Sequence, residues 1–119
     1  MNILLVEDHN INKVMMNLVI KKNIKNALID NIDNINDLND LIYNQSEDNL
    51  NKYKLIFMDR DILWWNTINA TKDLLKKDIP IIGVSHSQFE FVEQTWLNYS
   101  LPKHFTTLEL IDVLKLINI

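Results

Sequence analysis

Five polar or charged side chains stand at or just after the ends of short apolar runs: Glu7, Asp8, Asp59, Ser85 and Lys103. Apolar runs of this length are typical of strands that are buried on both faces of a parallel sheet. The carboxyl ends of parallel strands meet at one edge of the sheet, and ligands bind there. The sequence therefore predicts that these five side chains, although far apart in the chain, share one pocket.

Three of these side chains are carboxylates, and their mutual repulsion limits what the pocket can do. Two like charges about 4 Å apart repel by about 4 kcal/mol at an effective dielectric constant of about 20. A hard divalent cation such as Mg2+, which prefers oxygen ligands, relieves that repulsion. With the cation, the Lys103 ammonium and the Ser85 hydroxyl can neutralise a phosphoryl group on the third carboxylate, Asp59. The pattern is compatible with an aspartyl phosphate.

The composition of the chain removes several other chemistries. A single glycine, Gly83, leaves no Walker loop and no dinucleotide-binding fingerprint, and the absence of cysteine removes disulfides and thiol chemistry. The formal net charge of −4 weighs against binding to nucleic acid or to an anionic membrane. Since no apolar run approaches a membrane span and no signal-peptide pattern is present, we expect a cytoplasmic protein.

The elements that must position these residues alternate along the chain. Strands are expected at 3–6, 27–29, 55–58, 79–84 and near 101, with amphipathic helices beginning near 11, 33, 66, 87 and 106. The polar segment 45–52 is expected to be a loop. Five strand–helix units in 119 residues predict one α/β domain over 1–119, with a doubly wound parallel sheet.

Local signals mark several helix faces and ends. Ile11, Val14, Met15 and Leu18 recur at helical spacing, the pattern of an apolar face that packs on a core, and Met15 and Met16 are assigned to the core and flank of that helix. Asp33 is the expected N-cap of the second helix. The segment Thr106–Glu109 has the capping-box pattern and predicts the start of the last helix.

Four segments, in this order, resemble a response-regulator receiver domain of two-component signalling. Residues 3–12 are similar to the start of receivers, especially those attached to hybrid sensor histidine kinases, and residues 55–59 resemble the phosphoacceptor strand. Residues 80–85 resemble the strand that ends in the family's hydroxyl residue, and residues 101–105 resemble its Lys-Pro-Phe signature. The resemblance covers nearly the whole chain and implies a flavodoxin-like (βα)5 fold of the receiver type.

The resemblance also implies a role for each residue of the pocket. Asp59 would accept a phosphoryl group from a phosphohistidine of a histidine kinase or phosphotransfer protein, while Ser85 and Lys103 contact the phosphoryl oxygens. The implied Mg2+ ligands are Glu7, Asp8, Asp59 and the backbone carbonyl of Asp61. The domain would catalyse this transfer and its later hydrolysis itself, without an independent enzyme activity, and a downstream output domain is a further implied partner.

The sequence departs from the family pattern around the pocket. His86 stands where receivers have a small residue, and Ser100, beside Tyr99, stands where they have an aromatic one. His104 replaces a proline that follows a cis bond in the family, and because a cis bond before another residue costs about 3–4 kcal/mol, we expect a trans bond here. These departures keep a second function open, that of a pseudo-receiver acting as a non-phosphorylated protein-interaction module.

Two further hypotheses concern residues near the pocket. The histidines His9, His86 and His104 each follow a strand end, so they are expected to rim the pocket, where they would change its metal preference or its response to pH near 6.5. The segment 59–61 also matches the Asp-x-Asp motif of haloacid-dehalogenase-type phosphatases. That family places the motif early and its second acidic pair last, whereas the acidic pair comes first here.

Overall fold

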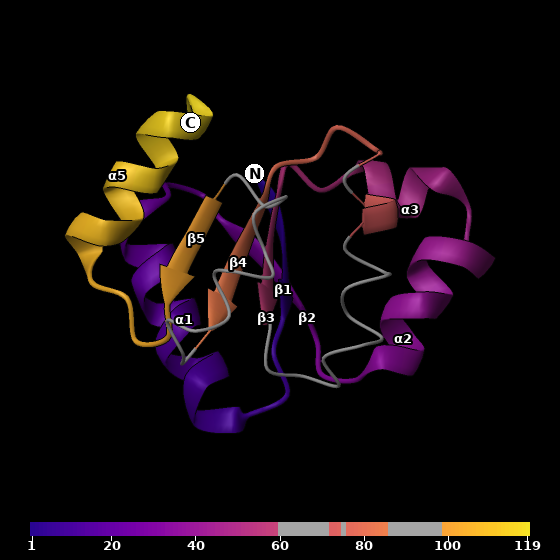
Figure 1. Cartoon of the computed structure of the whole chain (residues 1–119), viewed down its shortest axis with the longest axis horizontal. Coiled ribbons are helices and arrows are strands. Elements are labelled where there is room, and N and C mark those ends of the chain that lie inside the picture. The colour runs from indigo at the N-terminus through magenta and orange to yellow at the C-terminus, as the bar shows by residue number, and fades with distance from the viewer. Residues whose placement is uncertain (60–71, 75, 86–98) are drawn as a thin grey trace.

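The computed structural model describes residues 1–59, 72–74, 76–85 and 99–119. Its centre is a five-stranded sheet in the order β2-β1-β3-β4-β5, with every neighbouring pair parallel (Figure 1). The strands are β1 (Asn2–Val6), β2 (Leu28–Ile32), β3 (Leu55–Asp59), β4 (Ile81–Ser85) and β5 (Tyr99–Pro102). The strand order reverses between β1 and β3, which places a ligand site at the carboxyl ends of these two strands.

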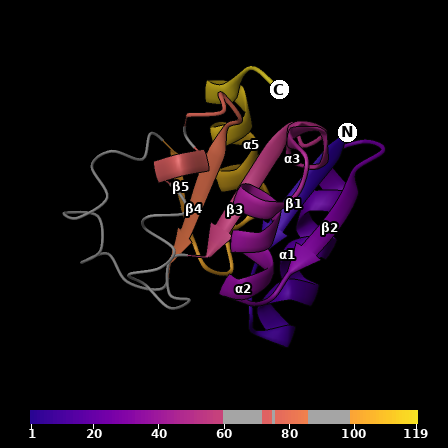
Figure 2. The ribbon, with the colours of Figure 1, turned by 90° about the vertical axis from the view of Figure 1, so that its right-hand side faces the viewer.

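Helices cover both faces of the sheet. The long helices α1 (Asn10–Asn23) and α5 (Thr107–Ile117) lie on one face (Figures 1 and 2). On the other face lie α2 (Ile35–Asn39), the π-helical turn η1 (Asp40–Asn44) and α3 (Glu47–Asn51). The predicted α/β fold, a doubly wound parallel sheet of the flavodoxin-like type, is therefore confirmed. Within the described part of the chain, no helix has the length and apolar character needed to span a membrane.

Strands β1 and β3 are apolar along most of their length, and both of their faces are buried. Along β1 and β3, alternate side chains enter two separate clusters, one under α1 and α5 and one under α2 and α3. Leu5 pairs with Phe57 in the first cluster, and Val6 pairs with Met58 in the second. Burial on both faces holds β1 and β3 in register, so the residues that end them are held side by side.

Helix starts and loops differ in part from the sequence predictions. Asn34, not Asp33, caps α2, and its side chain accepts a hydrogen bond from the Asp37 backbone at 2.8 Å. The prediction of a loop at 45–52 is wrong, since the segment contains α3, whose Leu50 is buried in the core under the second face. The capping box at Thr106 and Glu109 is confirmed, with both of its reciprocal hydrogen bonds.

The apolar pattern of α1 faces solvent, which corrects the sequence prediction. Ile11, Val14, Met15 and Leu18 are exposed, whereas Met16 is buried in the core. The buried face of α1 is instead the row of Asn12, Met16 and Ile20.

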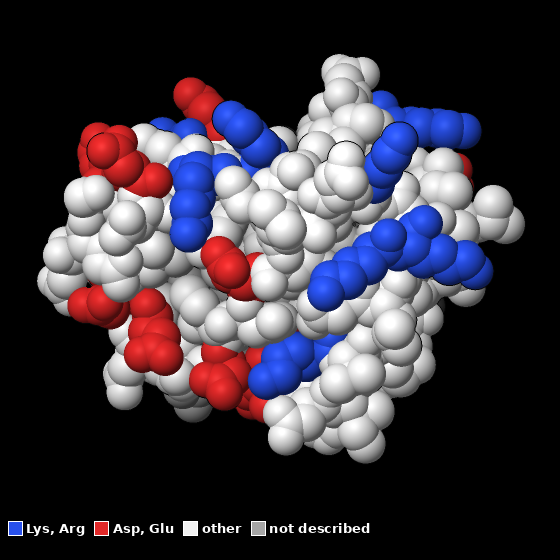
Figure 3. Space-filling view, turned by 180° about the vertical axis from the view of Figure 1, so that it is seen from behind, with Lys and Arg blue, Asp and Glu red and all other residues white. Residues whose placement is uncertain are grey.

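Charged side chains are unevenly distributed on the face of the molecule opposite to that of Figure 1. Lysines gather mainly toward one side of this face and carboxylates mainly toward the other (Figure 3).

A tyrosine joins the segment before β3 to the edge strand β2. The buried Tyr53 hydroxyl donates a hydrogen bond to Asp30 Oδ2 at 2.7 Å. The Lys52 ammonium lies 3.5 Å from the same oxygen. Burial of the hydroxyl, then the hydrogen bond and the charge of Asp30, raise the pKa of Tyr53 above the usual value of a tyrosine.

Replacing Tyr53→Phe is expected to lower the free energy of unfolding by about 1 kcal/mol at neutral pH, because one partly buried hydrogen bond is lost. The raised pKa means that the folded protein keeps the phenol proton to higher pH than the unfolded chain. The stabilisation is therefore complete below about pH 10 and is lost as the pH rises beyond it. Urea unfolding of both proteins should show stabilities that converge in alkaline solution.

Tyr43→Phe is the matched control, because the exposed Tyr43 hydroxyl also bonds a carboxylate, that of Asp73. An exposed pair of this kind contributes little, so this variant is expected to change stability by less than about 0.5 kcal/mol. Equal losses in the two variants would contradict the argument from burial.

Candidate functional site

Three carboxylates meet at the carboxyl ends of β1 and β3. Glu7 follows β1 directly, and its backbone N–H continues the ladder to Ile32 O at 3.0 Å, while Asp59 is the last residue of β3. One oxygen each of Glu7, Asp8 and Asp59 lies within 4.8 Å of the others. Glu7 and Asp59 are fully buried and Asp8 is exposed. The structure thus brings together the three carboxylates predicted from the sequence.

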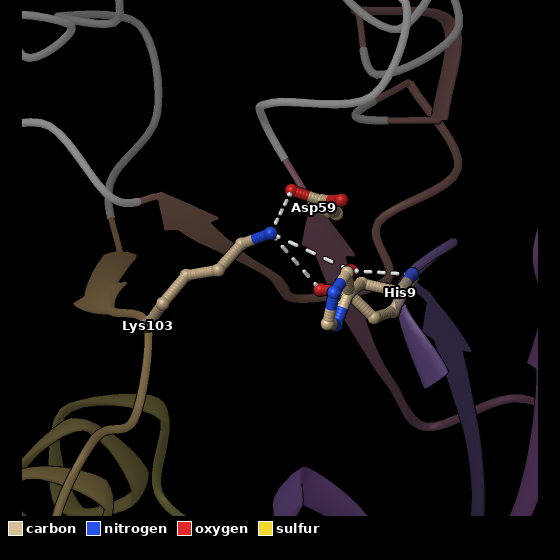
Figure 4. Close-up of polar contacts among 4 residues, drawn as sticks. His9, Asp59 and Lys103 are labelled. Carbon is tan, nitrogen blue, oxygen red and sulfur yellow. Dashed lines mark hydrogen bonds and ion pairs between the residues drawn. The ribbon is translucent and has the colours of Figure 1, made fainter. Parts of the chain in front are cut away.

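A single ammonium lies between the two buried carboxylates. Lys103 Nζ is 2.9 Å from Asp59 Oδ1 and 3.2 Å from Glu7 Oε2, and it also donates to Glu7 Oε1 at 3.4 Å (Figure 4). The Lys103 side chain is only 4% exposed. Burial alone would lower the pKa of Lys103, but the hydrogen bonds and charges of Asp59 and Glu7 outweigh it and raise the pKa. The ammonium is therefore charged at neutral pH.

The backbone around Lys103 holds this side chain in place without a proline. The Lys103–His104 peptide bond is trans, as expected, and His104 adopts a left-handed conformation with φ of 60°. The Lys103 backbone N–H donates to Ser85 O at 3.0 Å, which ties the segment to the end of β4. Phe105 stacks on Phe57, with ring centroids 6.0 Å apart. The departure from the family pattern at His104 therefore leaves Lys103 inside the pocket.

Other predicted site residues lie at the same edge or outside the described residues. Ser85 is the half-buried last residue of β4, at the same carboxyl edge as Asp59. His9 and His104 are exposed, and the contact of His9 with the pocket is made by its backbone N–H, which donates to Glu7 Oε1 at 3.1 Å. Asp61 and His86 lie outside the described residues, so the ligand role of Asp61 and the histidine hypothesis stay predictions.

Two contacts of Glu7 were not predicted from the sequence. These are the ion pair with Lys103 and the hydrogen bond from the His9 backbone. The sequence places Glu7 and Lys103 at one edge of the sheet, which indicates that the two residues are near each other. Only the structure shows that the Lys103 ammonium contacts Glu7 as well as Asp59.

The donor set of the pocket fits a hard divalent cation. The three carboxylates carry three negative charges and Lys103 one positive charge, which leaves two negative charges in the cluster. Glu7 Oε2 lies beside the ammonium but accepts no hydrogen bond from the described residues, so it retains a lone pair for a ligand. An all-oxygen set with this charge suits Mg2+ better than a softer metal.

Comparison with known proteins places the fold among receiver domains. No protein-family model and no curated protein matches the chain. Solved structures do: the bacteriophytochrome response regulator RtBRR superposes with a TM-score of 0.80 at 15% identity, over 99% of this chain and 78% of that one. A two-component response regulator from Legionella pneumophila gives 0.74 at 21% identity, over 98% and 97% of the two chains.

A third neighbour carries a metal in the corresponding fold. The receiver domain of a sensor histidine kinase from Pseudomonas aeruginosa, solved with a magnesium ion in its active-site cleft, superposes with a TM-score of 0.74. The identity is 21%, over 96% of this chain and 93% of that one. The chain thus has the fold of response-regulator receiver domains, which confirms the resemblance predicted from the four sequence segments at the level of the fold.

Replacing Lys103→Met is expected to destabilise the metal-free protein by about 3–5 kcal/mol, because it leaves two buried carboxylates without their shared cation. The double variant Lys103→Met with Glu7→Gln should recover part of that loss, since it also removes one of the two charges. Urea unfolding in the presence of a chelator measures both effects.

Lys77→Met is the control for loss of a lysine from an ion pair. Lys77 Nζ lies 3.2 Å from Glu47 Oε1 at the surface, where such pairs contribute less than about 1 kcal/mol. A Lys103→Met protein no less stable than the Lys77→Met protein would show that the buried ammonium does not hold the carboxylates together.

Proposed function

We propose that the chain is a single receiver domain, over residues 1–119, that accepts a phosphoryl group on Asp59 from a phosphohistidine of a histidine kinase or phosphotransfer protein. The observation that carries this proposal is the shared contact of Lys103 with Asp59 and Glu7 at the carboxyl edge of β1 and β3. The receiver fold of the solved neighbours supports it.

The proposed transfer uses the groups of this pocket in the following roles. An Asp59 carboxylate oxygen attacks the phosphorus, a P–O bond forms, and the P–N bond breaks so that the histidine nitrogen keeps the electron pair and takes a proton from water. The Lys103 ammonium and the Ser85 hydroxyl bind phosphoryl oxygens. Mg2+, held by Glu7, Asp8, Asp59 and the carbonyl of Asp61, would supply further positive charge to those oxygens.

The same contacts link the phosphorylation site to the neighbouring strands β3 and β4. In the unphosphorylated protein, the Lys103 ammonium contacts both Glu7 and Asp59. When this ammonium binds the oxygens of a new phosphoryl group, its contact with Glu7 weakens. Movement of Lys103 is passed to β4 through its backbone bond to Ser85 O, and to β3 through the stack of Phe105 on Phe57. We propose that a downstream output partner reads this change.

One observation favours the alternative function of a pseudo-receiver. Asp59 is 0% exposed and forms an ion pair with Lys103, so a phosphodonor reaches it only if the surrounding groups move. If they do not move, the domain binds partners without a phosphorylation cycle. The two functions differ in whether Asp59 forms a covalent adduct.

Incubation with Mg2+ and acetyl phosphate is expected to add one phosphoryl group to the protein, detected by intact mass. Asp59→Asn, which keeps the shape but removes the nucleophilic carboxylate, should give no adduct. Asp30→Asn, at the exposed edge strand β2, is the matched control and should be phosphorylated as the unaltered protein is. No adduct on the unaltered protein, or an equal adduct on Asp59→Asn, would favour the pseudo-receiver.

Mg2+ is expected to raise the melting temperature of the protein. A ligand that binds only the folded state stabilises it by about 1.4 kcal/mol at about ten times its Kd. Glu7→Gln and Asp8→Asn should weaken this response, since each removes a charged ligand, whereas Asp112→Asn on α5 should leave it unchanged. Equal melting shifts in all four proteins would place the metal elsewhere.

A further inference from the structure

Two short segments at the amino edge of the sheet carry an excess of positive charge. Residues 51–54 precede β3 and residues 76–80 precede β4, and because these strands are parallel neighbours, both segments lie where the strands begin, at the top of Figure 1. Together they contain four lysines and one aspartate: Lys52, Lys54, Lys76, Lys77 and Asp78. The chain as a whole has a formal net charge of −4. This edge is therefore basic in an acidic protein.

The two segments enclose a hollow, which we name the basic hollow. It has a volume of about 330 Å3, and its lining includes Asn51, Lys54, Lys77 and Asp78. Two lysines and one aspartate leave one net positive charge in the lining itself, and Lys52 and Lys76 follow next to it in the sequence. The basic hollow thus combines a concave shape with the charge of this edge.

The core and the sheet fix the walls of the basic hollow. Tyr53 and Ile79 also line it, and they are only 6% and 8% exposed because they pack into the core under α2 and α3. The Lys54 backbone N–H donates to the first residue of β1 at 2.9 Å, and the Pro80 carbonyl accepts from the Ile56 backbone N–H of β3 at 3.0 Å. A ligand therefore meets a preformed surface, and little conformational entropy is lost on the protein side when it binds.

The ammonium groups at this edge can bind further carboxylates at low cost. Lys54 forms no ion pair with a described residue. Lys77 Nζ lies 3.2 Å from Glu47 Oε1, but the Glu47 side chain is 78% exposed. Lys76 Nζ lies 3.4 Å from Asp73 Oδ1, and this pair is exposed as well. Because exposed ion pairs contribute little to stability, the exchange of one partner carboxylate for another costs little.

We propose that the basic hollow binds a short acidic segment of a partner protein, whose carboxylates form ion pairs with Lys54 and Lys77. Charge complementarity selects this partner. A nucleic acid extends beyond the hollow and is repelled by the net negative charge of the rest of the protein. An anionic membrane is repelled in the same way and is flat where this surface is concave. The basic hollow lies at the opposite end of β3 from Asp59, so the proposal does not depend on phosphorylation.

The test uses a short peptide in which glutamate and serine alternate. The matched peptide replaces every glutamate with glutamine. Both are titrated into the unphosphorylated, Mg2+-free protein, and NMR shifts of the backbone amides report binding. We expect the glutamate peptide to shift the amides of residues 51–54 and 77–79, with an affinity that falls as ionic strength rises. The glutamine peptide should bind at least about tenfold more weakly.

Variants locate the contact. Lys54→Gln and Lys77→Gln should each weaken binding of the glutamate peptide by about threefold or more, and the double variant by about tenfold. Lys13→Gln is the matched control, because it removes the same charge from the first turn of α1, which begins at the opposite edge of the sheet. Its affinity should stay within about twofold of that of the unaltered protein. Unfolding curves should change little in all four variants, since none of these lysines is fully buried.

Three results would overturn the proposal. The first is equal affinity for the two peptides, which would remove charge as the selecting feature. The second is an equal effect of Lys13→Gln and Lys54→Gln, or amide shifts confined to other elements. The third is tighter binding of an oligothymidylate, of phosphatidylserine vesicles or of a second copy of the chain through Lys54 and Lys77, which would identify a different ligand. Because no phosphodonor is present, these results are separate from the test of Asp59.

Discussion

The structure depends on one electrostatic constraint, which is that a single buried ammonium forms ion pairs with two buried carboxylates. Glu7 and Asp59 end neighbouring strands, and neither carboxylate is in contact with bulk water. Two such charges side by side are unstable without a cation. Lys103, which directly follows β5, supplies this positive charge. The position of Lys103 therefore bears directly on the stability of this edge of the sheet.

The hydrophobic core holds the residues of this cluster in position. Strands β1 and β3 are buried on both faces, so their register cannot slip without exposing apolar side chains or burying polar ones. Phe105 anchors the segment after Lys103 by stacking on Phe57, and the backbone bond to Ser85 anchors Lys103 itself. The bond before His104, the position at which receiver domains have a proline, is trans, and these two contacts hold the segment that carries Lys103.

Most of the sheet and its acidic edge could be predicted from the sequence, because an uninterrupted apolar run such as that of β3 has few alternatives to a strand buried on both faces. The face of α1 that packs on the core could not be predicted from the sequence. Its buried row, Met16 and Ile20, is short, and the exposed row of four apolar residues gives the stronger helical pattern. Helix α3 was missed because Leu50 is its one buried residue. The contact of Lys103 with Glu7 depends on side-chain conformation, on which sequence spacing carries no information.

The division of α1 into two faces has a consequence for how this protein can change through evolution. The inward face, with Met16 and Ile20, is tied to the core and thus to the geometry of the pocket, whereas the outward face, with Ile11 and Leu18, makes little contribution to folding. Mutations on the outward face can therefore accumulate without a loss of stability. The character of that surface can therefore change in a lineage while the cluster of Glu7, Asp59 and Lys103 at the strand ends is kept.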